Sequence, residues 1–415
     1  MLNVVETFSG IGAQTEALKR ANIEHHVSAT VEWDINAIYA YDIMHNGPQD
    51  LSIYRHHNKE SLITELSQYN LSSDGKTPLT EQSLMGMSMG VLKSILYAIE
   101  RAHNLVDINQ VNASDLDEDI DLLTYSFPCQ DLSVSSLWWH NDSGIDRNSG
   151  NRSSLIWQIE RILLEFSESN RTLPKALLME NVSNILSKKH IDNFNEWKNF
   201  LEELGYYNKV YTLNSKDFGI PQSRERTYLL SVYVGDDQQK RNLLEEYFFN
   251  NNLENISLKD EQISSLEAYL KLDYTDDVFR DEAIEATPNF TPSREKIYKN
   301  NPILAIDSMV PNNQIARTIT TKQDRHPNSG IITFSDNKQL IPGCKYRNIT
   351  PREAFLLMGF QEETYNRLLK SNEKLNDSKP YLTPTKLLKL AGNSIVVDVL
   401  IKIFEQLEEI RVKIL

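Results

Sequence analysis

The stretch that decides the fold is IDLLTYSFPCQDLS, residues 120–133. Residues 120–125 form a short apolar run, which predicts a buried strand of a parallel sheet. Pro128 ends that strand, because proline cannot donate to a strand ladder and it biases Phe127 towards an extended backbone. Ligands bind at the carboxyl ends of the strands in an open parallel sheet, so Cys129 is a candidate nucleophile. The competing interpretation is a small buried thiol.

The length and composition indicate a protein with one large core and a second, smaller domain. The chain has 415 residues, of which 40% are hydrophobic. Its two cysteines, Cys129 and Cys344, cannot form a disulfide framework, which favours a reducing, cytoplasmic compartment. Neither an 18-residue apolar run nor a secretory leader is recognisable, so we expect no membrane association.

The net charge of −15 is distributed unevenly along the chain. Residues 236–285 contain 5 Lys/Arg and 14 Asp/Glu, for a net charge of −9, whereas residues 294–353 contain 10 and 5, for a net charge of +5. A local basic stripe can bind phosphates while other faces stay acidic. The overall acidity therefore does not exclude a nucleic-acid partner.

The first residues predict a cofactor loop. Residues 3–8 read as a strand and residues 14–21 as a helix, with Gly10 and Gly12 between them. Glycines at such a turn let the backbone approach a ligand that faces the helix N-terminus. A short Gly-x-Gly also occurs in ordinary tight turns, so this pattern alone leaves both interpretations open.

A second strand, residues 27–31, ends in Glu32-Trp33-Asp34. An acidic residue at the end of the second strand can accept hydrogen bonds from ribose hydroxyls, and we assign this role to Glu32. We assign Trp33 to contact with the face of an adenine base in such a nucleotide cofactor. Asp34 is interpreted as the N-cap of the helix that begins near Asn36.

The string SFPCQ followed by DLS resembles the catalytic motif of the C5-cytosine DNA methyltransferases. Other motifs of that family follow in the family's order over most of the first 235 and the last 70 or so residues. They are Glu6-x-Phe8-x-Gly10-x-Gly12, Glu-Asn-Val at 180–182, Gln-x-Arg-x-Arg at 222–226, YRNITPREAFLLMGF at 346–360 and AGNSIVV at 391–397. Ala13 stands where the family usually has a further glycine.

The resemblance implies a catalytic set of Cys129, Glu180 and Arg226, with Arg224 in support. It also implies S-adenosyl-L-methionine as cofactor and no metal. The cofactor-binding residues that it implies are Phe8, Gly10, Ile11, Gly12, Glu32, Trp33, Asp115, Leu116, Phe127, Leu155, Asn393 and Ser394. For Asp115, a place in an acidic surface loop is an equally good interpretation.

A cysteine, a glutamate and an arginine are the residue types that methylation of cytosine at carbon 5 needs. Carbon 5 of cytosine is a poor nucleophile, and a thiolate that adds at carbon 6 pushes electron density towards it. The charge that develops on the ring is neutralised by a protonated carboxyl at ring nitrogen 3 and an arginine at the carbonyl oxygen. A base inside a duplex is out of reach of such a site, so it must be flipped out.

The expected fold is a doubly wound, Rossmann-like α/β domain over residues 1–235, with a helical insertion at about 47–110. Residues 236–345 are predicted to form a smaller target-recognition domain, with a DNA cleft between the two. Residues 346–384 are then a hinge and supporting motif, and residues 385–415 a C-terminal helix that returns to the catalytic domain.

Two loops are candidates for DNA contact. Residues 317–330 carry side chains that can pair with base edges, and the candidates are Thr321, Lys322, Gln323, Arg325 and Asn328. The alternative for this segment is a hinge or surface loop. The long loop 131–151 contains Trp138 and Trp139, which could fill the space left by a flipped base or pack against the next helix.

Other functions fit the sequence less well. An RNA cytosine methyltransferase with two active-site cysteines is disfavoured because the Glu180 motif contains none, although a transfer-RNA enzyme with DNA-type motifs is harder to exclude. A non-catalytic DNA-binding relative would not need Cys129. A dinucleotide dehydrogenase would need a fuller glycine fingerprint. We therefore expect a monomer acting on double-stranded DNA, with a separate cognate restriction endonuclease as a possible partner.

Overall fold

The computed structural model describes residues 1–129, 132, 144–147, 152–256, 258, 263–306, 308–324, 327–334, 344–376 and 379–415. It divides into two compact units. The first contains Met1–Leu213, Glu225–Ile256 and Leu400–Leu415, and the second contains Asn214–Arg224 and Ser257–Val399. Within the described ranges, every helix is too short or too polar to cross a bilayer.

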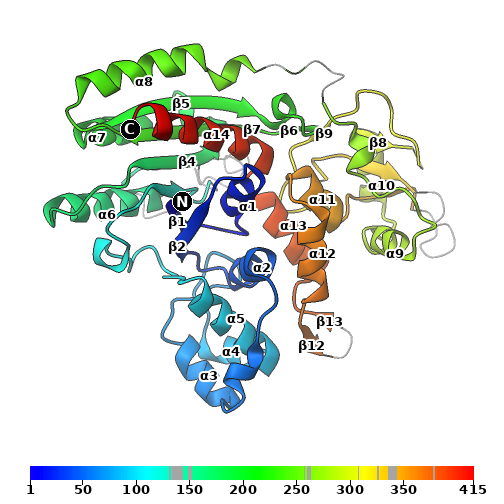
Figure 1. Cartoon of the computed structure of the whole chain (residues 1–415). Coiled ribbons are helices and arrows are strands. Elements are labelled where there is room, and N and C mark those ends of the chain that lie inside the picture. Colours follow the sequence, from blue (N-terminus) through cyan, green and yellow to red (C-terminus); the bar gives the residue numbers. More distant parts are fainter. Residues whose placement is uncertain are drawn as a thin grey trace. The chain divides into compact units, whose positions relative to one another are not determined.

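The first unit is built on a six-stranded sheet with the order β2-β1-β3-β4-β7-β5 (Figure 1). The first four strands in this order are parallel, and β7 runs antiparallel to β4. The strands are β1 (Leu2–Thr7), β2 (His25–Val31), β3 (Leu122–Tyr125), β4 (Ala176–Val182), β5 (Tyr206–Asn214) and β7 (Glu225–Tyr233).

The chain changes direction across the sheet at β1. It leaves β1 for β2 on one side and later returns to β3 on the other, which makes the carboxyl ends of β1 and β3 the topological switch point. The predicted strands at residues 3–8, 27–31 and 120–125 correspond to β1, β2 and β3 and are confirmed. The sheet and its helices confirm the expected Rossmann-like α/β class.

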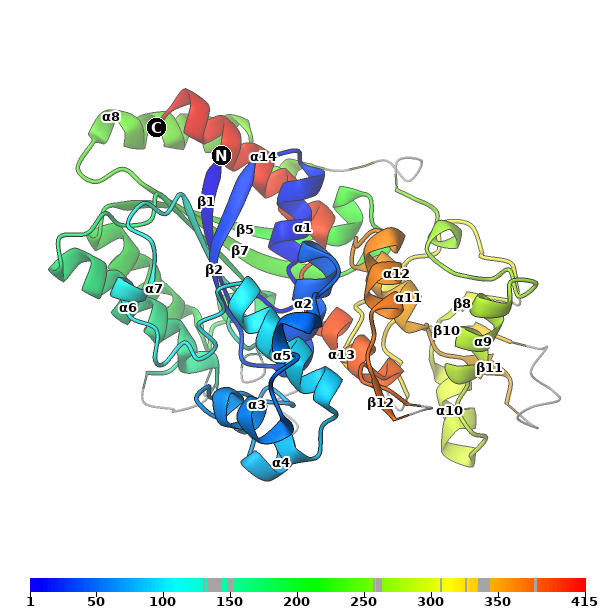
Figure 2. The same ribbon diagram turned by 60° about the horizontal axis from the view of Figure 1, so that its bottom comes forward.

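Helices cover both faces of this sheet (Figure 2). On one face, α6 (Ile156–Glu168) and α7 (Ile191–Glu203) bury Phe166 and Trp197 against alternate residues of β3 and β4, such as Leu123 and Leu177. On the other face lie α1 (Ala13–Arg20) and the part of α14 (Val397–Lys413) that belongs to this unit. Such two-sided burial explains why these strands are nearly continuous apolar runs.

The insertion after the second strand is helical, as predicted. After α2 (Ile35–Asn46), it contains α3 (Lys59–Leu66), α4 (Glu81–Met85) and α5 (Met89–Arg101). These helices gather in one lobe (Figure 1), where α5 packs against both α2 and α3. The Ser/Gly/Pro-rich segment between α3 and α4 is a loop, and part of it returns to the end of β2.

The helix α8 (Gln238–Asn250) belongs to the first unit, although residues 236–345 were predicted to form the recognition domain. The physical reason is aromatic packing on β5. Phe248 stacks on Tyr207 with ring centroids 5.7 Å apart, and it also meets Tyr211 edge-on. The main segment of the second unit therefore begins after Ile256 and not at residue 236.

The second unit contains a three-stranded sheet of order β11-β10-β8 and two further strand pairs, β6-β9 and β12-β13. Its strands are β6 (Gln222–Ser223), β8 (Ile303–Ala305), β9 (Ala316–Arg317), β10 (Ile331–Thr333), β11 (Tyr346–Arg347), β12 (Lys374–Asn376) and β13 (Lys379–Pro380). Its helices are α9 (Asp277–Glu285), α10 (Pro292–Asn300), α11 (Pro351–Leu357), α12 (Glu362–Lys370) and α13 (Pro384–Asn393).

Helix α11 begins with a capping box at Thr350. The Thr350 side chain accepts from the Glu353 amide, Pro351 is the first helical residue, and Glu353 accepts from the Thr350 amide. The same carboxylate forms a bidentate pair with Arg347, and both side chains are fully buried. This desolvated pair fixes the start of α11 to β11, because removing either partner would leave a buried charge.

Candidate active site and cofactor cavity

The turn that carries Cys129 is held by three hydrogen bonds to consecutive carbonyl groups. Asn181 Nδ2 donates to the carbonyl of Phe127 over 3.1 Å, and Ser153 Oγ donates to that of Pro128 over 2.7 Å. The amide of Leu132 donates to the carbonyl of Cys129 itself over 3.0 Å. Cys129 is half-buried. The thiol therefore stands on a fixed backbone at the carboxyl end of β3.

Glu180 and Arg226 form an ion pair on neighbouring strands. Arg226 Nε lies 3.4 Å from Glu180 Oε1, and only 16% and 11% of the two side chains are exposed. The pair follows from the antiparallel register of β4 and β7, in which Arg226 faces Val182 and Glu180 faces Tyr228. Two predicted catalytic residues are thus in contact within the first unit.

The register of β3 and β4 brings the thiol and this carboxyl to one edge of the sheet. The strands are parallel neighbours, with Tyr125 opposite Met179. Glu180 is the next residue of β4, and Cys129 lies four residues beyond Tyr125 after the Pro128 turn. The strand that carries Glu180 therefore lies directly beside the strand that leads to Cys129. The strand order thus brings a nucleophile, a carboxyl and a guanidinium to the same edge of the sheet.

Arg224, which was predicted to support catalysis, has a different place. Arg224 belongs to the second unit and is 5% exposed, and its guanidinium donates to the carbonyls of Ile319, Gly392 and Ser394 of the same unit. Arg224 and Arg226 do not share a face of one strand, because Arg224 lies at the break between β6 and β7. Arg224 therefore stabilises the C-terminus of α13, where a cation meets exposed carbonyl groups.

A cavity of about 410 Å³ opens at the carboxyl ends of β1 and β2. Four of the predicted cofactor residues line it, namely Phe8, Glu32, Trp33 and Leu155. Residues that sequence reasoning missed complete the lining, and they are Val31, Gly75, Val106, Asp107, Ile108, Asn109, Pro128, Arg152, Ser154 and Gln158. Apolar walls with a few carboxylates suit a flat base and a ribose diol.

Glu32 links this cavity to the glycine loop. Its Oε2 accepts from the amide of Gly10 over 3.0 Å, and its Oε1 accepts from the amide of Asp34 over 2.8 Å. Burial, reinforced by repulsion from Asp34, raises the pKa of Glu32 to about 7. Asp34 also accepts from the Asn36 amide, which confirms its predicted role as the N-cap of α2.

The loop between β1 and α1 has an unusual backbone. Phe8 has a φ of 54°, a left-handed conformation that is costly for a residue with a side chain and that turns it towards the cavity. At Gly10, a Cβ atom would meet nothing within 4 Å, so this residue faces open space. At Gly12, φ is 75° and a Cβ would lie 2.5 Å from His45 Nε2.

We expect Gly12→Ala to abolish binding of S-adenosyl-L-methionine while leaving most of the fold intact. The new methyl group would need space held by His45 and Tyr41, and His45 Nε2 also donates to the Ile11 carbonyl of the loop. Isothermal titration calorimetry would measure the loss. Gly47→Ala is the matched control, because Gly47 also has a positive φ but a Cβ there would meet nothing. Equal affinity in both variants would contradict this prediction.

Glu6, beneath the same loop, is fully buried. Its Oε1 accepts from Thr15 Oγ1 over 2.7 Å, whereas its Oε2 has no hydrogen-bond partner within the described ranges. Burial raises the pKa of Glu6 to about 7 from the ordinary value of 4.5. The folded chain thus keeps a proton that the unfolded chain loses, so the contribution of Glu6 to stability falls as pH rises from about 4.5 to about 7.

Glu6→Gln should therefore stabilise the protein at pH 8 by up to roughly 3 kcal/mol and have little effect at pH 4.5, because glutamine carries no charge to bury. Urea unfolding of the variant and the parent chain, without cofactor, at both pH values would measure the difference. A gain that is equal at the two pH values would show that packing, and not ionisation, is responsible.

Asp115 and Leu116 were predicted to bind the cofactor, but the structure places them elsewhere. The Asp115 carboxylate caps its own 3₁₀ helix by accepting from the Asn112 amide over 2.8 Å, and neither residue lines the cavity. Asp107 and Ile108 do line it. A hydrogen-bonded bridge between Thr30 and Asn104 brings this segment to the end of β2.

The sequence contained a signal for Asp107, because it follows the apolar pair Leu105 and Val106 much as Glu32 follows β2. Phe127, another predicted cofactor residue, is 2% exposed and belongs to the core beneath the sheet. Asn393 and Ser394 belong to the second unit, at the end of α13, so their contact with the cofactor stays a prediction.

The predicted recognition loop lies in the second unit. Lys322 and Asn328 are exposed and Thr321 is half-buried, so these side chains can be reached. Gln323 is 3% exposed, and its amide donates to the Thr320 carbonyl and accepts from Ser329 Oγ. These bonds hold its side chain within the loop, and a contact of Gln323 with bases stays a prediction. Arg325, like Trp138 and Trp139, lies outside the described residues.

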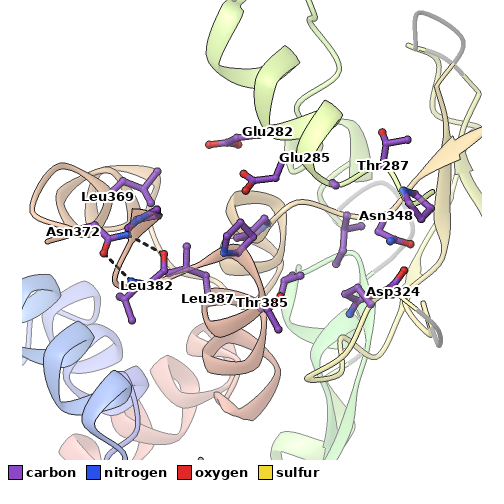
Figure 3. Close-up of a pocket in the computed structure, with 18 of the residues that line it drawn as sticks. Glu282, Glu285, Thr287, Asp324, Asn348, Leu369, Asn372, Leu382, Thr385 and Leu387 are labelled. Atoms are coloured by element: carbon purple, nitrogen blue, oxygen red, sulfur yellow. Dashed lines mark hydrogen bonds between the residues drawn. The ribbon is translucent and has the colours of Figure 1, made fainter. Parts of the chain in front are cut away.

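A second cavity, of about 680 Å³, lies behind this loop within the second unit (Figure 3). Glu282 and Glu285 of α9 face it from one side, and Asp324 of the loop contributes from another. Glu282 is paired with Arg352, and burial raises the pKa of Glu285. We assign no reaction to this cavity, whose carboxylates would repel phosphate groups.

Comparison with known proteins agrees with this geometry. A family model described as C-5 cytosine-specific DNA methylase matches residues 92–409. The type II methyltransferase M2.ScrFI of Lactococcus lactis subsp. cremoris is 32% identical over 98% of this chain and 99% of its own. The orphan methyltransferase M.SssI of Spiroplasma monobiae is 40% identical over 56% of this chain and 59% of its own.

Solved structures show the same fold. The crystal structure of the S. pombe Dnmt2 methyltransferase superposes with a TM-score of 0.61, at 21% sequence identity, over 99% of both chains. At this identity the likeness concerns the fold alone.

Proposed function

Because the chain belongs to the C-5 cytosine-specific DNA methylase family, we propose that it methylates carbon 5 of a cytosine flipped out of duplex DNA within one short sequence. Enzymes of this family use S-adenosyl-L-methionine as the methyl donor. The observation that carries the proposal is the edge of the first unit where the Cys129 turn follows β3 and the Glu180–Arg226 pair joins β4 to β7.

The cavity at β1 and β2 fits the cofactor. Its two carboxylates, Glu32 and Asp107, can accept hydrogen bonds from the hydroxyl and amino groups of an adenosine. Gly10 borders open space. When bound, S-adenosyl-L-methionine supplies an electrophilic methyl group. Phe8, Trp33 and Leu155 supply the apolar surface for the base.

The residues of the chain then have separate tasks. The Cys129 thiolate forms a bond to carbon 6, which leaves an enamine with its electron density at carbon 5. Glu180, in its protonated form, gives a hydrogen bond or a proton to ring nitrogen 3, and Arg226 stabilises negative charge at the carbonyl oxygen. After methylation, the proton at carbon 5 passes to water, its bonding electrons re-form the 5,6 double bond, and sulfur leaves carbon 6 as the Cys129 thiolate. Any proton given to ring nitrogen 3 returns to Glu180, which restores the ring and the residue.

We assign target recognition to the second unit, with Thr321, Lys322 and Asn328 as candidate base or phosphate contacts. The support is the net charge of +5 in residues 294–353 and the exposure of these side chains. Lys322 carries a charge suited to phosphate, and Asn328 carries an amide suited to adenine.

The test of the function is bisulfite sequencing of plasmid DNA from cells that express the chain, beside cells that express Cys129→Ser. We expect protected cytosines in one short sequence, and none with the variant. If a folded protein that binds S-adenosyl-L-methionine protects no cytosine, the DNA substrate is wrong, and transfer RNA is the next substrate to test.

We further propose that the chain acts in the cytoplasm as the protective partner of a restriction endonuclease. The support is the type II designation of the Lactococcus relative, which matches over nearly its whole length. Extracts of the source cells should cut unmethylated plasmid and spare plasmid that this chain has methylated. Absence of such cleavage would favour a solitary enzyme, the description given to the Spiroplasma relative.

A further inference from the structure

The chain between β2 and β3 reaches the cofactor cavity at two places, residues 106–109 and the loop of residues 70–77. Gly75 of this loop lines the cavity together with Trp33 and Asp107. The helices α3, α4 and α5 gather in a lobe (Figure 1), and none of their residues lines the cavity.

The loop is joined to the end of β2 by backbone hydrogen bonds. The amide of Ser72 donates to the carbonyl of Trp33, and the amide of Ile35 donates to the carbonyl of Ser72, each over 2.8 Å. Asn36 Nδ2 adds a bond to the carbonyl of Ser73 over 2.9 Å. These three bonds fix the backbone that presents Trp33 to the cavity.

The loop also orients Asp107. Asn70 Nδ2 donates to Asp107 Oδ2 over 2.6 Å, while Oδ1 accepts from the amide and the side chain of Asn109. Both carboxylate oxygens are therefore held, and Asp107 is 7% exposed. Hydrogen bonds to a buried carboxylate are among the stronger ones, so Asn70 is well placed to set its direction.

The far end of the loop is closed by Arg152, whose Nη1 donates to the carbonyl of Gly75 over 3.3 Å. Asp74 stiffens the turn, because its Oδ1 accepts from the amides of Lys76 and Thr77. We propose that the 70–77 loop is a wall of the cofactor site and that Asn70 is a positioning residue, acting through Asp107 on the adenosine part of the cofactor. This inference rests on the proposed function of the cavity.

The test compares Asn70→Ala with Gln68→Ala, an amide two residues away whose side chain is exposed. We expect Asn70→Ala to weaken binding of S-adenosyl-L-methionine and S-adenosyl-L-homocysteine equally, by about 10-fold in calorimetry, because both share the adenosine. Its KM for the cofactor should rise with kcat nearly unchanged. Asn70→Asp should bind both ligands more weakly than Asn70→Ala does, because a second carboxylate would face Asp107.

A measurement on the unsubstituted chain guards against a purely structural effect. Hydrogen exchange should slow in residues 70–77 when S-adenosyl-L-homocysteine binds, and stay unchanged in α3 of the same insertion. Affinities for Asn70→Ala within about twofold of the Gln68→Ala control would overturn the inference while the proposed function stands. Failure of the unsubstituted chain to bind either ligand would instead overturn the proposed function.

Discussion

Cys129→Ser is expected to lower the rate of methyl transfer by roughly 10⁴-fold or more, because a serine hydroxyl is a far weaker nucleophile than a thiolate. Transfer of a tritiated methyl group to DNA would measure the rate. Affinity for S-adenosyl-L-methionine should be unchanged, because Cys129 does not line the cofactor cavity.

Cys344→Ser is the matched control. This second thiol lies in the other unit, is 8% exposed and donates to the carbonyl of Tyr346. The control should keep nearly full activity. If Cys129→Ser retained activity near that of Cys344→Ser, Cys129 would not be the nucleophile.

A duplex that carries 5-fluorocytosine at the target position would test the covalent step itself. Fluorine cannot leave carbon 5 as a proton does, so the adduct between sulfur and carbon 6 should accumulate after methylation. We expect a DNA–protein species that survives denaturing electrophoresis with the unsubstituted chain and is absent with Cys129→Ser.

The second large effect is expected at Glu180, where Glu180→Gln should lower the rate by roughly 10²- to 10³-fold. Glutamine keeps the shape of the side chain but cannot supply a proton to ring nitrogen 3, and it loses the charge that faces Arg226 across 3.4 Å. Single-turnover rates with saturating DNA and cofactor would separate this effect from binding.

The control for Glu180 is Glu196→Gln, which removes the charge of a half-exposed carboxylate paired with Arg147. Its rate should be unchanged. The double variant Glu180→Gln with Arg226→Ala should lose less than the two single losses combined, because the residues act on one ring. Additive losses, or a rate for Glu180→Gln within about threefold of the parent, would contradict the assigned roles.

Local sequence determined the scaffold of this site. The apolar run before Pro128, the glycines after β1 and the acidic residue after β2 each define a strand and its end, and these are short-range properties of the chain. The Thr350-Pro351-Glu353 helix start and the Asp34 N-cap are local in the same sense. Family resemblance added the roles of Cys129, Glu180 and Arg226.

Only the tertiary structure decided which of several similar residues reach the site. Asp107 and Asp115 both precede β3, but only Asp107 lies at the cavity, because the pairing of Thr30 with Asn104 carries its segment to β2. From the sequence alone, Arg224 was a candidate for catalysis and Gln323 for contact with bases. Both are buried, and both side chains donate to backbone carbonyls. Asn70 meets Asp107 from 37 residues away. The physical reason is that periodicity and breakers specify elements, whereas partners distant in sequence are chosen by packing and by the need to satisfy buried polar groups.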